Sequence, residues 1–219
     1  MKTAELAPIY SELARAYDCL NKDFYEGKLP SAIITLQSQS AGGGNVYGWA
    51  SKDRWIDIDG NKYYELNISA EYLTRDIYNL ISTLNHEMVH IYCWEKGIKD
   101  TSNNYRYHNK RFKAEAEKRG LVIDKAPTVG FSVTSPSDTF VEYIDKLNIK
   151  DVFKMSRFDP STAADSESDK PKKRKKRPFY ECPECGATLR GKPGLKILCG
   201  ECECAFEYKE FNEDDEDEV

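Results

Sequence analysis

The spacing of apolar residues near the start of the chain is typical of an amphipathic helix. Over residues 4–25 these side chains recur at intervals of three and four, at Leu6, Ile9, Tyr10, Leu13, Tyr17, Leu20 and Phe24. Such a stripe faces a core on one side of a helix with about 3.6 residues per turn. Gly27 and Pro30 follow the stripe, and both favour the end of a helix. We therefore expect one helix over 4–25.

A second apolar stripe predicts two consecutive helical pieces over 70–96. Ser69 and Thr74 are candidate N-caps, because a hydroxyl group there can accept a hydrogen bond from a free backbone amide. Gly97 marks the end of the second piece, since glycine readily adopts the left-handed conformation that follows many helices. The apolar stripe occupies one side of this helix and leaves another side free for polar chemistry.

Short runs rich in β-branched and aromatic residues predict strands. We expect one strand at 32–36 and a small antiparallel sheet over 46–68, where Asp59-Gly60 separates two alternating runs in the manner of a hairpin turn. A further strand is expected at 121–123, whereas the apolar run at 140–144 fits either a strand or a helix. The predicted fold class is α+β, with helices and a small antiparallel sheet.

Composition and charge divide the chain into four parts. Its 219 residues, 40% of them hydrophobic, suffice for one medium domain with a small appendage. We expect the main domain at 1–150 and a linker at 151–178, where a segment rich in Ser, Ala and Asp precedes a basic run. A small cysteine-rich domain is expected at 179–210 and an acidic tail at 211–219. The net charge of −5 hides this uneven distribution and therefore says little about partners.

Neither a membrane span nor a secretory signal is expected. No apolar run approaches the length of a transmembrane helix, and the N-terminal residues lack the order of a signal peptide. We expect a cytoplasmic protein, associated with the nucleoid in a bacterium or nuclear in a eukaryote. Five of the seven cysteines fall within 182–204, and in a reducing compartment such a cluster favours metal binding over disulfides. Cys19 and Cys93 are interpreted as small apolar residues on helices.

Residues 83–92 contain the pattern H-E-x-x-H, formed by His86, Glu87 and His90. Histidines four apart lie on the same face of a helix, so both imidazoles can bind one Zn²⁺. Glu87 then lies beside the ion's water and can take its proton. The alternative is a chance spacing on a partly buried helix. With only three histidines in the chain, chance produces the pattern in fewer than about one shuffled sequence in a hundred.

The remaining histidine, His108, supports the metal site. It follows His90 by 18 residues, after a polar stretch that can fold back. It also begins a predicted helix over 108–117 that ends at Gly120, and at that edge it can supply a third ligand. One metal site then accounts for every histidine in the chain.

Two C-x-x-C pairs, Cys182 with Cys185 and Cys199 with Cys202, predict a structural zinc ribbon. Four thiolates within tetrahedral reach are the ligands that such an ion needs. Cys204 is left over, and replacement of Cys202 by Cys204 as the fourth ligand is an open alternative. A pair of redox-active motifs is a weaker interpretation, because no thioredoxin-like βαβ pattern surrounds them.

The order of these motifs resembles the SprT-like metalloprotease family, which includes the eukaryotic Spartan proteases. The matching residues are Asn21 and Phe24, Leu29-Pro30, Tyr47-Gly48-Trp49, Thr83 to His90, and His108 with Phe112. The resemblance covers about residues 5–125. It implies a zincin-like fold in which His86, His90 and His108 hold a catalytic zinc and Glu87 is the general base. Many members of the family also carry a C-terminal zinc ribbon.

The leading hypothesis is therefore a zinc endopeptidase with one catalytic and one structural zinc. Glu87 would assist the attack of a zinc-bound water on a peptide bond and pass the proton to the leaving amine. An exposed edge of the sheet over 46–68 would bind the protein substrate as an added strand. The candidates for stabilising the oxyanion are Tyr105, Tyr107 and Tyr143. Better-studied members of the family cleave proteins crosslinked to DNA, which implies a DNA-associated substrate.

The competing hypothesis is a nucleic-acid-binding or scaffolding protein with a non-catalytic metal site. Its ribbon and the basic run at 172–177 would contact DNA, single-stranded or otherwise, through phosphates and without reading sequence. The same run also fits a solvated spacer or a nuclear-import signal. Glu87 argues against a non-catalytic site, because a structural site needs ligands but no base.

Overall fold

The computed structural model describes residues 4–38, 46–102, 107–126, 129–158 and 179–209. Contacts within the chain divide it into two compact units, Met1–Ala163 and Ala164–Val219. Three sequence predictions lie outside the described residues, namely those for Tyr105, for the basic run at 172–177 and for the acidic tail at 211–219. Among the described residues, no helix combines the length and apolarity that crossing a membrane requires.

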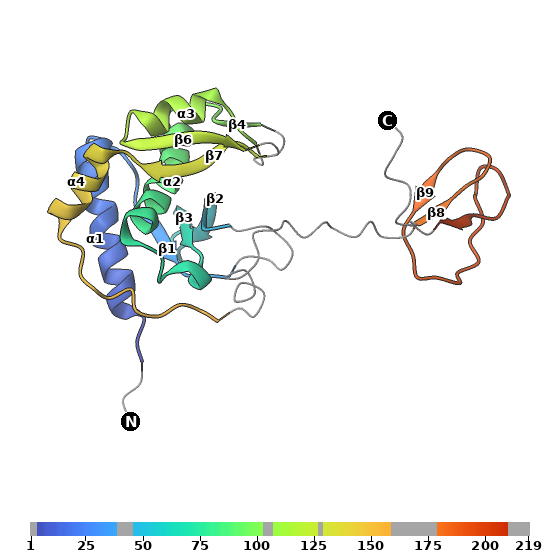
Figure 1. Cartoon of the computed structure of the whole chain (residues 1–219), viewed down its shortest axis with the longest axis horizontal. Helices are drawn as coiled ribbons and strands as arrows, with labels where there is room; N and C mark the ends of the chain where they lie inside the picture. The colour runs from blue at the N-terminus through green and yellow to red at the C-terminus, as the bar shows by residue number, and fades with distance from the viewer. Residues whose placement is uncertain (1–3, 39–45, 103–106, 127–128, 159–178, 210–219) are drawn as a thin grey trace. The chain divides into compact units, whose positions relative to one another are not determined.

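The first unit mixes helices with two small sheets (Figure 1). In chain order its elements are α1 (Ala7–Phe24), β1 (Ala32–Thr35), β2 (Gly48–Ile56), β3 (Lys62–Ile68), the 3₁₀ helix η1 (Ala70–Tyr72), α2 (Ile77–Glu95), β4 (Thr101–Ser102), β5 (Tyr107–His108), α3 (Lys110–Glu117), β6 (Leu121–Ala126), β7 (Gly130–Pro136) and α4 (Asp138–Leu147). The expected helix over 4–25 and the strands at 32–36 and 121–123 are thus present. The run at 140–144, which fitted either element, is helical in α4.

The first sheet has the strand order β1-β3-β2. Strands β2 and β3 form the antiparallel hairpin expected over 46–68, with a register shift between Ser51 and Trp55. The predicted antiparallel pairing over 46–68 is confirmed, and the sheet also includes β1, which pairs with β3 in parallel. The central strand β3 is parallel to β1 and antiparallel to β2, so β2 runs in the direction opposite to both other strands. This order leaves β2 at an edge of the sheet.

The second sheet has the strand order β4-β5-β7-β6, so β4 is also an edge strand. Helix α2 lies between the two sheets in Figure 1, and it contacts β2 and β3 on one side and β7 and α3 on the other. Its core positions are fully buried with apolar residues of α1, α3 and β3; they are Leu80, Ile81, Leu84, Met88, Val89 and Ile91. Burial on several sides holds α2 in a fixed position.

The ends of α2 have clear local causes. Asp76 is the N-cap, and its side chain accepts hydrogen bonds from the backbone amides of Tyr78 and Asn79. The expectation that Thr74 caps this helix is wrong, because Asp76 stands next to the first helical residue. Ser69 occupies the N-cap position of η1, as predicted, but its side chain makes no cap hydrogen bond and instead donates its hydroxyl to the carbonyl of Val46 at 2.6 Å.

At the other end of α2, Gly97 has φ of +64° and donates its amide to the carbonyl of Trp94. The amide of Ile98 reaches back to the carbonyl of Cys93 at 2.8 Å. These two bonds form a Schellman motif, which satisfies the last carbonyls and turns the chain sharply. The expected end at Gly97 is confirmed, and the turn directs residues 98–102 back along the helix.

The second unit contains a three-stranded antiparallel sheet, in the order β10-β8-β9, formed by β8 (Phe179–Glu181), β9 (Thr188–Leu189) and β10 (Glu207–Lys209). The hydroxyl of Tyr180 accepts a hydrogen bond from the amide of Leu195 and donates one to the carbonyl of Lys192. Tyr180 is buried on β8, and these two bonds attach the loop that contains Lys192 and Leu195 to the sheet.

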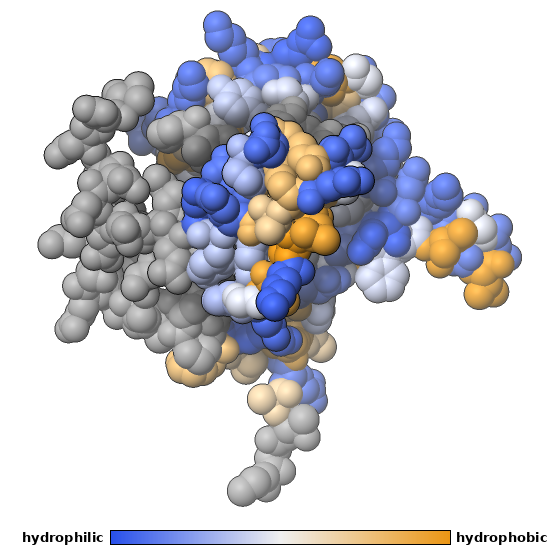
Figure 2. Space-filling view, turned by 90° about the vertical axis from the view of Figure 1, so that its right-hand side faces the viewer, coloured by the Kyte–Doolittle hydropathy of each residue, from blue (hydrophilic) through white to orange (hydrophobic). Residues whose placement is uncertain are grey.

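Hydrophilic residues predominate on the face shown in Figure 2, and hydrophobic residues are exposed there in separate groups. The most exposed large apolar side chains of the described residues are Ile58, Phe158, Leu198 and Ile56. Two of them, Ile56 and Ile58, belong to the tip of the β2–β3 hairpin, whereas Leu198 belongs to the second unit.

Candidate metal centres

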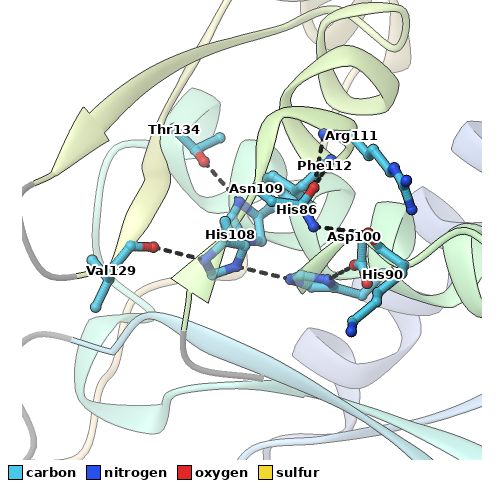
Figure 3. A network of polar contacts seen from close by, with 10 residues as sticks. His86, His90, Asp100, His108, Asn109, Arg111, Phe112, Val129 and Thr134 are labelled. Atoms are coloured by element: carbon cyan, nitrogen blue, oxygen red, sulfur yellow. Dashed lines mark hydrogen bonds and ion pairs between the residues drawn. The ribbon is translucent and has the colours of Figure 1, made fainter. Parts of the chain in front are cut away.

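Helix α2 and strand β5 bring the three histidines of the chain together (Figure 3). His86 and His90 lie one turn apart on α2, and one nitrogen of each histidine lies within 4.8 Å of the others. Nε2 of His108 is 3.2 Å from Nε2 of His86 and 3.1 Å from Nε2 of His90. The sequence pattern therefore corresponds to one three-histidine cluster.

The spacing of this cluster fits a zinc ion. A Zn–N distance of about 2.0–2.1 Å in tetrahedral geometry places two ligand nitrogens about 3.3 Å apart. The Nε2–Nε2 separations of 3.1 and 3.2 Å in the structure are close to that value. With three protein nitrogens, a tetrahedral ion keeps one position for water or substrate, as catalytic zinc sites do. The roles of His86, His90 and His108 as ligands stay a prediction that the geometry supports.

Each histidine has an outer partner on its other ring nitrogen (Figure 3). Nδ1 of His86 lies 2.7 Å from Oγ1 of Thr134, and Nδ1 of His90 lies 2.5 Å from Oδ2 of Asp100. Nδ1 of His108 lies 3.4 Å from the carbonyl oxygen of Val129. A proton on Nδ1 leaves Nε2 free as a metal-binding lone pair, so these contacts orient the rings and select their tautomers.

Sequence analysis did not identify Thr134, Asp100 or Val129. Asp100 follows Gly97 in the segment that the Schellman motif turns back along α2, and Thr134 belongs to β7. A carboxylate ten residues after His90 was the one local signal available. The contact of His86 with Thr134, 48 residues away, depends wholly on the packing of β7 against α2.

His108 is positioned by β5 and not by a helix. The predicted helix over 108–117 is present as α3, but it begins at Lys110 and not at His108, because Asn109 is its N-cap and accepts hydrogen bonds from the amides of Arg111 and Phe112. A cap residue has extended backbone, and the residue before it lies outside the helix. The amide of His108 instead donates to the carbonyl of Val129 at 3.0 Å, as β5 pairs in parallel with β7.

The backbone beside His108 requires glycine at position 130. Gly130 pairs with His108 and has φ of +73°. A Cβ atom there would lie 2.2 Å from the carbonyl oxygen of His108, which is far inside van der Waals contact. Glycine therefore allows both the backbone conformation and the close approach of β7 to β5.

The aromatic ring of Phe112 supports all three imidazoles. Its centroid lies 4.5 Å from that of His86 and 4.7 Å from those of His90 and His108. Phe112 is fully buried on the first turn of α3. The cluster thus has an apolar base that excludes water from one side.

The electrostatics of the cluster favour neutral imidazoles. Burial lowers the pKa of His86 well below its ordinary value, and burial lowers the pKa of His108 to about 4. The charge of a protonated His90 has the same effect on both, though it is smaller. A neutral imidazole is the form that binds a metal, so these two residues offer free lone pairs throughout the neutral pH range.

Glu87 lies beside the histidines at the edge of the first sheet. It is only 5% exposed, and burial raises the pKa of its carboxyl group to about 7. A hydrogen bond from the backbone of Ala50, on β2, acts in the opposite direction. A Cβ atom on Gly48 would lie 3.3 Å from Cγ of Glu87, so β2 passes directly over this side chain. Strand β2 is thus the expected edge strand beside α2, the helix that carries His86 and His90.

A hollow of about 1030 Å³ lies next to the cluster. Its lining includes Ser51 and Lys52 from β2, Trp94 from α2, and Asp100 and Thr101 before and in β4. The edge strands of both sheets therefore border the same hollow. Asp100 connects this hollow to the three-histidine cluster, because this residue lines the hollow and its carboxylate contacts His90.

The three tyrosines considered for the oxyanion have different positions. Tyr143 donates its hydroxyl to Asp23 at 2.8 Å and packs against Phe24, so it belongs to the contact between α4 and α1. Tyr107 precedes His108 on β5 and is half-buried. Tyr105 lies outside the described residues. Of the two described tyrosines, Tyr107 is the one that adjoins a residue of the histidine cluster, His108, along β5.

The second unit brings four cysteines together. The sulfur atoms lie within 4.8 Å of one another in Cys182, Cys185, Cys199 and Cys202. Four such thiolates are the tetrahedral ligand set of a structural zinc ion. Hydrogen bonds from the backbone of Cys185 and Glu184 contribute to lowering the pKa of Cys182 to about 6, with the contribution of Cys185 the largest. Amides that stabilise a thiolate in this way favour metal binding. The alternative with Cys204 as the fourth ligand is less well supported, because the four sulfurs that lie together include Cys202 and not Cys204.

One of three comparisons with known proteins found a match. A family model described as the SprT-like family matches residues 13–130, which is more than half of the 219 residues and contains all three histidines. No curated protein and no solved structure matches the chain.

Proposed function

The chain belongs to the SprT-like family, and we propose that it is a zinc-dependent endopeptidase with a zincin-like catalytic domain. One observation carries the proposal: a buried carboxylate, Glu87, lies beside three imidazoles whose Nε2 atoms converge at a spacing suited to zinc. A purely structural zinc site needs a fourth ligand and no base. The family is associated with metalloprotease activity, which agrees with this arrangement.

The residues of the chain have distinct roles in this proposal. A zinc ion held by the histidines supplies Lewis acidity towards water and a peptide carbonyl. Glu87 takes a proton from the attacking water and delivers it to the nitrogen of the leaving amine. Burial raises the pKa of this carboxyl group in the metal-free chain, and a bound cation beside it would lower that pKa and favour the carboxylate that accepts the water's proton. Asp100, Thr134 and the carbonyl of Val129 hold the imidazoles in orientation.

The substrate we propose is an extended segment of protein. Strand β2 is an edge strand whose residues 52–56 are exposed, and an edge offers unpaired backbone groups to an added strand. The hollow bordered by β2 and β4 gives space for side chains of such a segment. Glu87 accepts a hydrogen bond from Ala50, so the catalytic carboxylate is attached to the edge on which the substrate would lie.

We also propose that DNA is a partner, with DNA-associated or crosslinked proteins as substrates. The support is the run of six basic residues at 172–177 together with exposed Arg190, Lys192 and Lys196 in the second unit. Cationic side chains of this kind bind phosphates without reading sequence. A scaffolding protein with a non-catalytic metal site is the second candidate, and buried Glu87 speaks against it.

The test compares the wild-type protein with Glu87→Gln and His90→Ala in the cleavage of an unfolded protein. Glu87→Gln should retain the metal and the fold but lose cleavage, because the amide cannot accept the water's proton. His90→Ala should lose both the metal and cleavage. Metal content measured on the same samples separates the two effects. Cleavage by Glu87→Gln at the wild-type rate would exclude Glu87 as the base. Absence of cleavage by the wild-type protein loaded with zinc would favour the scaffolding candidate.

A further inference from the structure

The backbone turns at the two C-x-x-C pairs, Cys182 with Cys185 and Cys199 with Cys202, have the same hydrogen-bond pattern, and we call each turn a knuckle. Comparing the two knuckles shows which position Cys204 occupies. In the first knuckle, Gly186 follows the second cysteine with φ of +71°; in the second knuckle, Glu203 takes the same place with φ of +54°. The amide of Cys182 donates to the carbonyl of Ala187 at 2.9 Å, and the amide of Cys199 donates to that of Cys204 at 2.8 Å. Cys204 therefore corresponds to Ala187, a position that is not a ligand.

Although Cys204 stands outside the ligand positions, its sulfur is very close to one of them. Sγ of Cys204 lies 3.4 Å from Sγ of Cys182. A disulfide has an S–S distance of about 2.05 Å, so side-chain movement of little more than an ångström joins the two sulfurs. Cys204 is half-buried, whereas Cys182 is only 1% exposed. A small oxidant thus reaches Cys204 before it reaches its neighbour.

We propose that Cys204 is an oxidation site at which hydrogen peroxide converts Cys182 and Cys204 into a disulfide, and that this reaction releases the zinc of the ribbon. The fit of this centre to zinc rests on the four-cysteine set described above. The proposal is independent of proteolysis, because all of its residues belong to the second unit.

The chemistry balances with one equivalent of peroxide. The thiolate of Cys204 attacks one peroxide oxygen; the S–O bond forms, the O–O bond breaks, and the departing hydroxide is protonated to water. The thiolate of Cys182 then attacks Sγ of the sulfenic acid, the S–S bond forms, and a second hydroxide leaves as water. Two thiols are oxidised by two electrons, and the peroxide is reduced to two waters. Cys182 can no longer donate a thiolate, so three ligands remain.

The experiment uses the full-length protein carrying His90→Ala, so that only the ribbon holds zinc. Hydrogen peroxide is added, zinc release is followed with a chromogenic chelator, and the disulfide is located by mass spectrometry of non-reduced peptides. Cys204→Ser should bind zinc as the parent does and release it at least about fivefold more slowly, because the second sulfur is absent. Cys19→Ser is the matched control, since it removes a free thiol from the other unit and should leave the rate unchanged.

Three results would overturn the proposal. One is release from Cys204→Ser at the parent rate. Another is a disulfide that joins Cys182 to Cys185 or Cys199 in place of Cys204. The third is a Cys204→Ser protein without ribbon zinc, which would make Cys204 a ligand. Cys202→Ser should fail to retain the zinc, and this variant checks the ligand set directly.

Discussion

Oδ2 of Asp100 lies 2.5 Å from Nδ1 of His90, and the carboxylate itself is only 2% exposed. This pair connects the hollow between the edge strands to the three-histidine cluster. A buried anion on the outer nitrogen of an imidazole fixes its tautomer and strengthens it as a ligand. Of the three outer contacts described, only this one involves a charged group, whereas Thr134 and Val129 offer a hydroxyl and a carbonyl.

Asp100→Asn should weaken zinc binding at the histidine cluster about 10- to 100-fold, because the amide keeps the size of the side chain but removes its charge. The measurement is a competition titration with a chelator of known zinc affinity. The ribbon zinc serves as an internal control and should be unaffected. An unchanged affinity at the histidine cluster would mean that Asp100 has only a packing role.

The full-length protein should bind two zinc ions at separable centres. His90→Ala and the double variant Cys182→Ser/Cys185→Ser should each retain one ion, because the two ligand sets belong to different units. Elemental analysis after reconstitution and removal of free metal measures the stoichiometry. Loss of both ions in either variant would contradict two independent centres.

The stability of the zinc-free protein should depend on pH through Glu87. Its pKa is raised from 4.5 to about 7 by burial, so the folded state holds the proton more tightly than the unfolded state. The resulting stability is fully present below pH 4.5 and is lost as the pH rises through 7. The loss is on the order of 3 kcal/mol in the free energy of unfolding, at about 1.4 kcal/mol for each unit of pKa difference.

Glu87→Gln isolates this effect from the titration of the histidines. Denaturant unfolding of both zinc-free proteins is measured from pH 4 to 8, and the difference between their unfolding free energies is compared. That difference should shift in favour of the Gln variant as the pH rises. Two parallel curves would show that the Glu87 carboxyl titrates near its ordinary pKa.

Gly130→Ala should weaken both the fold and zinc binding. The new Cβ would lie 2.2 Å from the carbonyl of His108, so β5 must move away from β7 and carry its imidazole with it. Gly60→Ala is the matched control, because Gly60 has φ of +85° but no atom within 4 Å of its added Cβ. We expect about 1–2 kcal/mol of destabilisation for Gly60→Ala, and at least about 1 kcal/mol more for Gly130→Ala. Equal zinc affinities in the two variants would exclude the proposed link to His108.

Replacing the six basic residues at 172–177 with Ser or Gln should reduce the salt dependence of DNA binding. Each phosphate contacted by a cationic side chain releases a counterion, so fewer cations give a smaller slope in a salt titration. Cleavage of a free unfolded protein should be nearly unchanged, while DNA-stimulated cleavage should fall. Deletion of residues 211–219 should strengthen DNA binding at low salt, because the acidic tail competes for the same basic run. Identical slopes for the wild-type and neutralised proteins would leave the run as a spacer.

The sequence by itself determined the features that depend on short spacings. His86 and His90 share one face of α2 because four residues make about one helical turn. The C-x-x-C pairs and the β2–β3 hairpin are local in the same sense, since a few consecutive residues set their geometry. His108 was proposed as the third ligand because it is the remaining histidine of the chain, and the family resemblance supported that role; no local rule determines its position.

Tertiary structure alone decided the surroundings of these residues. Thr134 reaches His86, β1 pairs in parallel with β3, and Sγ of Cys204 lies beside that of Cys182. His108 belongs to a short strand where the sequence predicted a helix, because pairing with β7 outweighed the helical pattern that follows it. Long-range packing sets such contacts. Thr134 lies 48 residues after His86, and Cys204 lies 22 residues after Cys182. Periodicity describes which side of an element is apolar, but it does not specify which distant element covers that side.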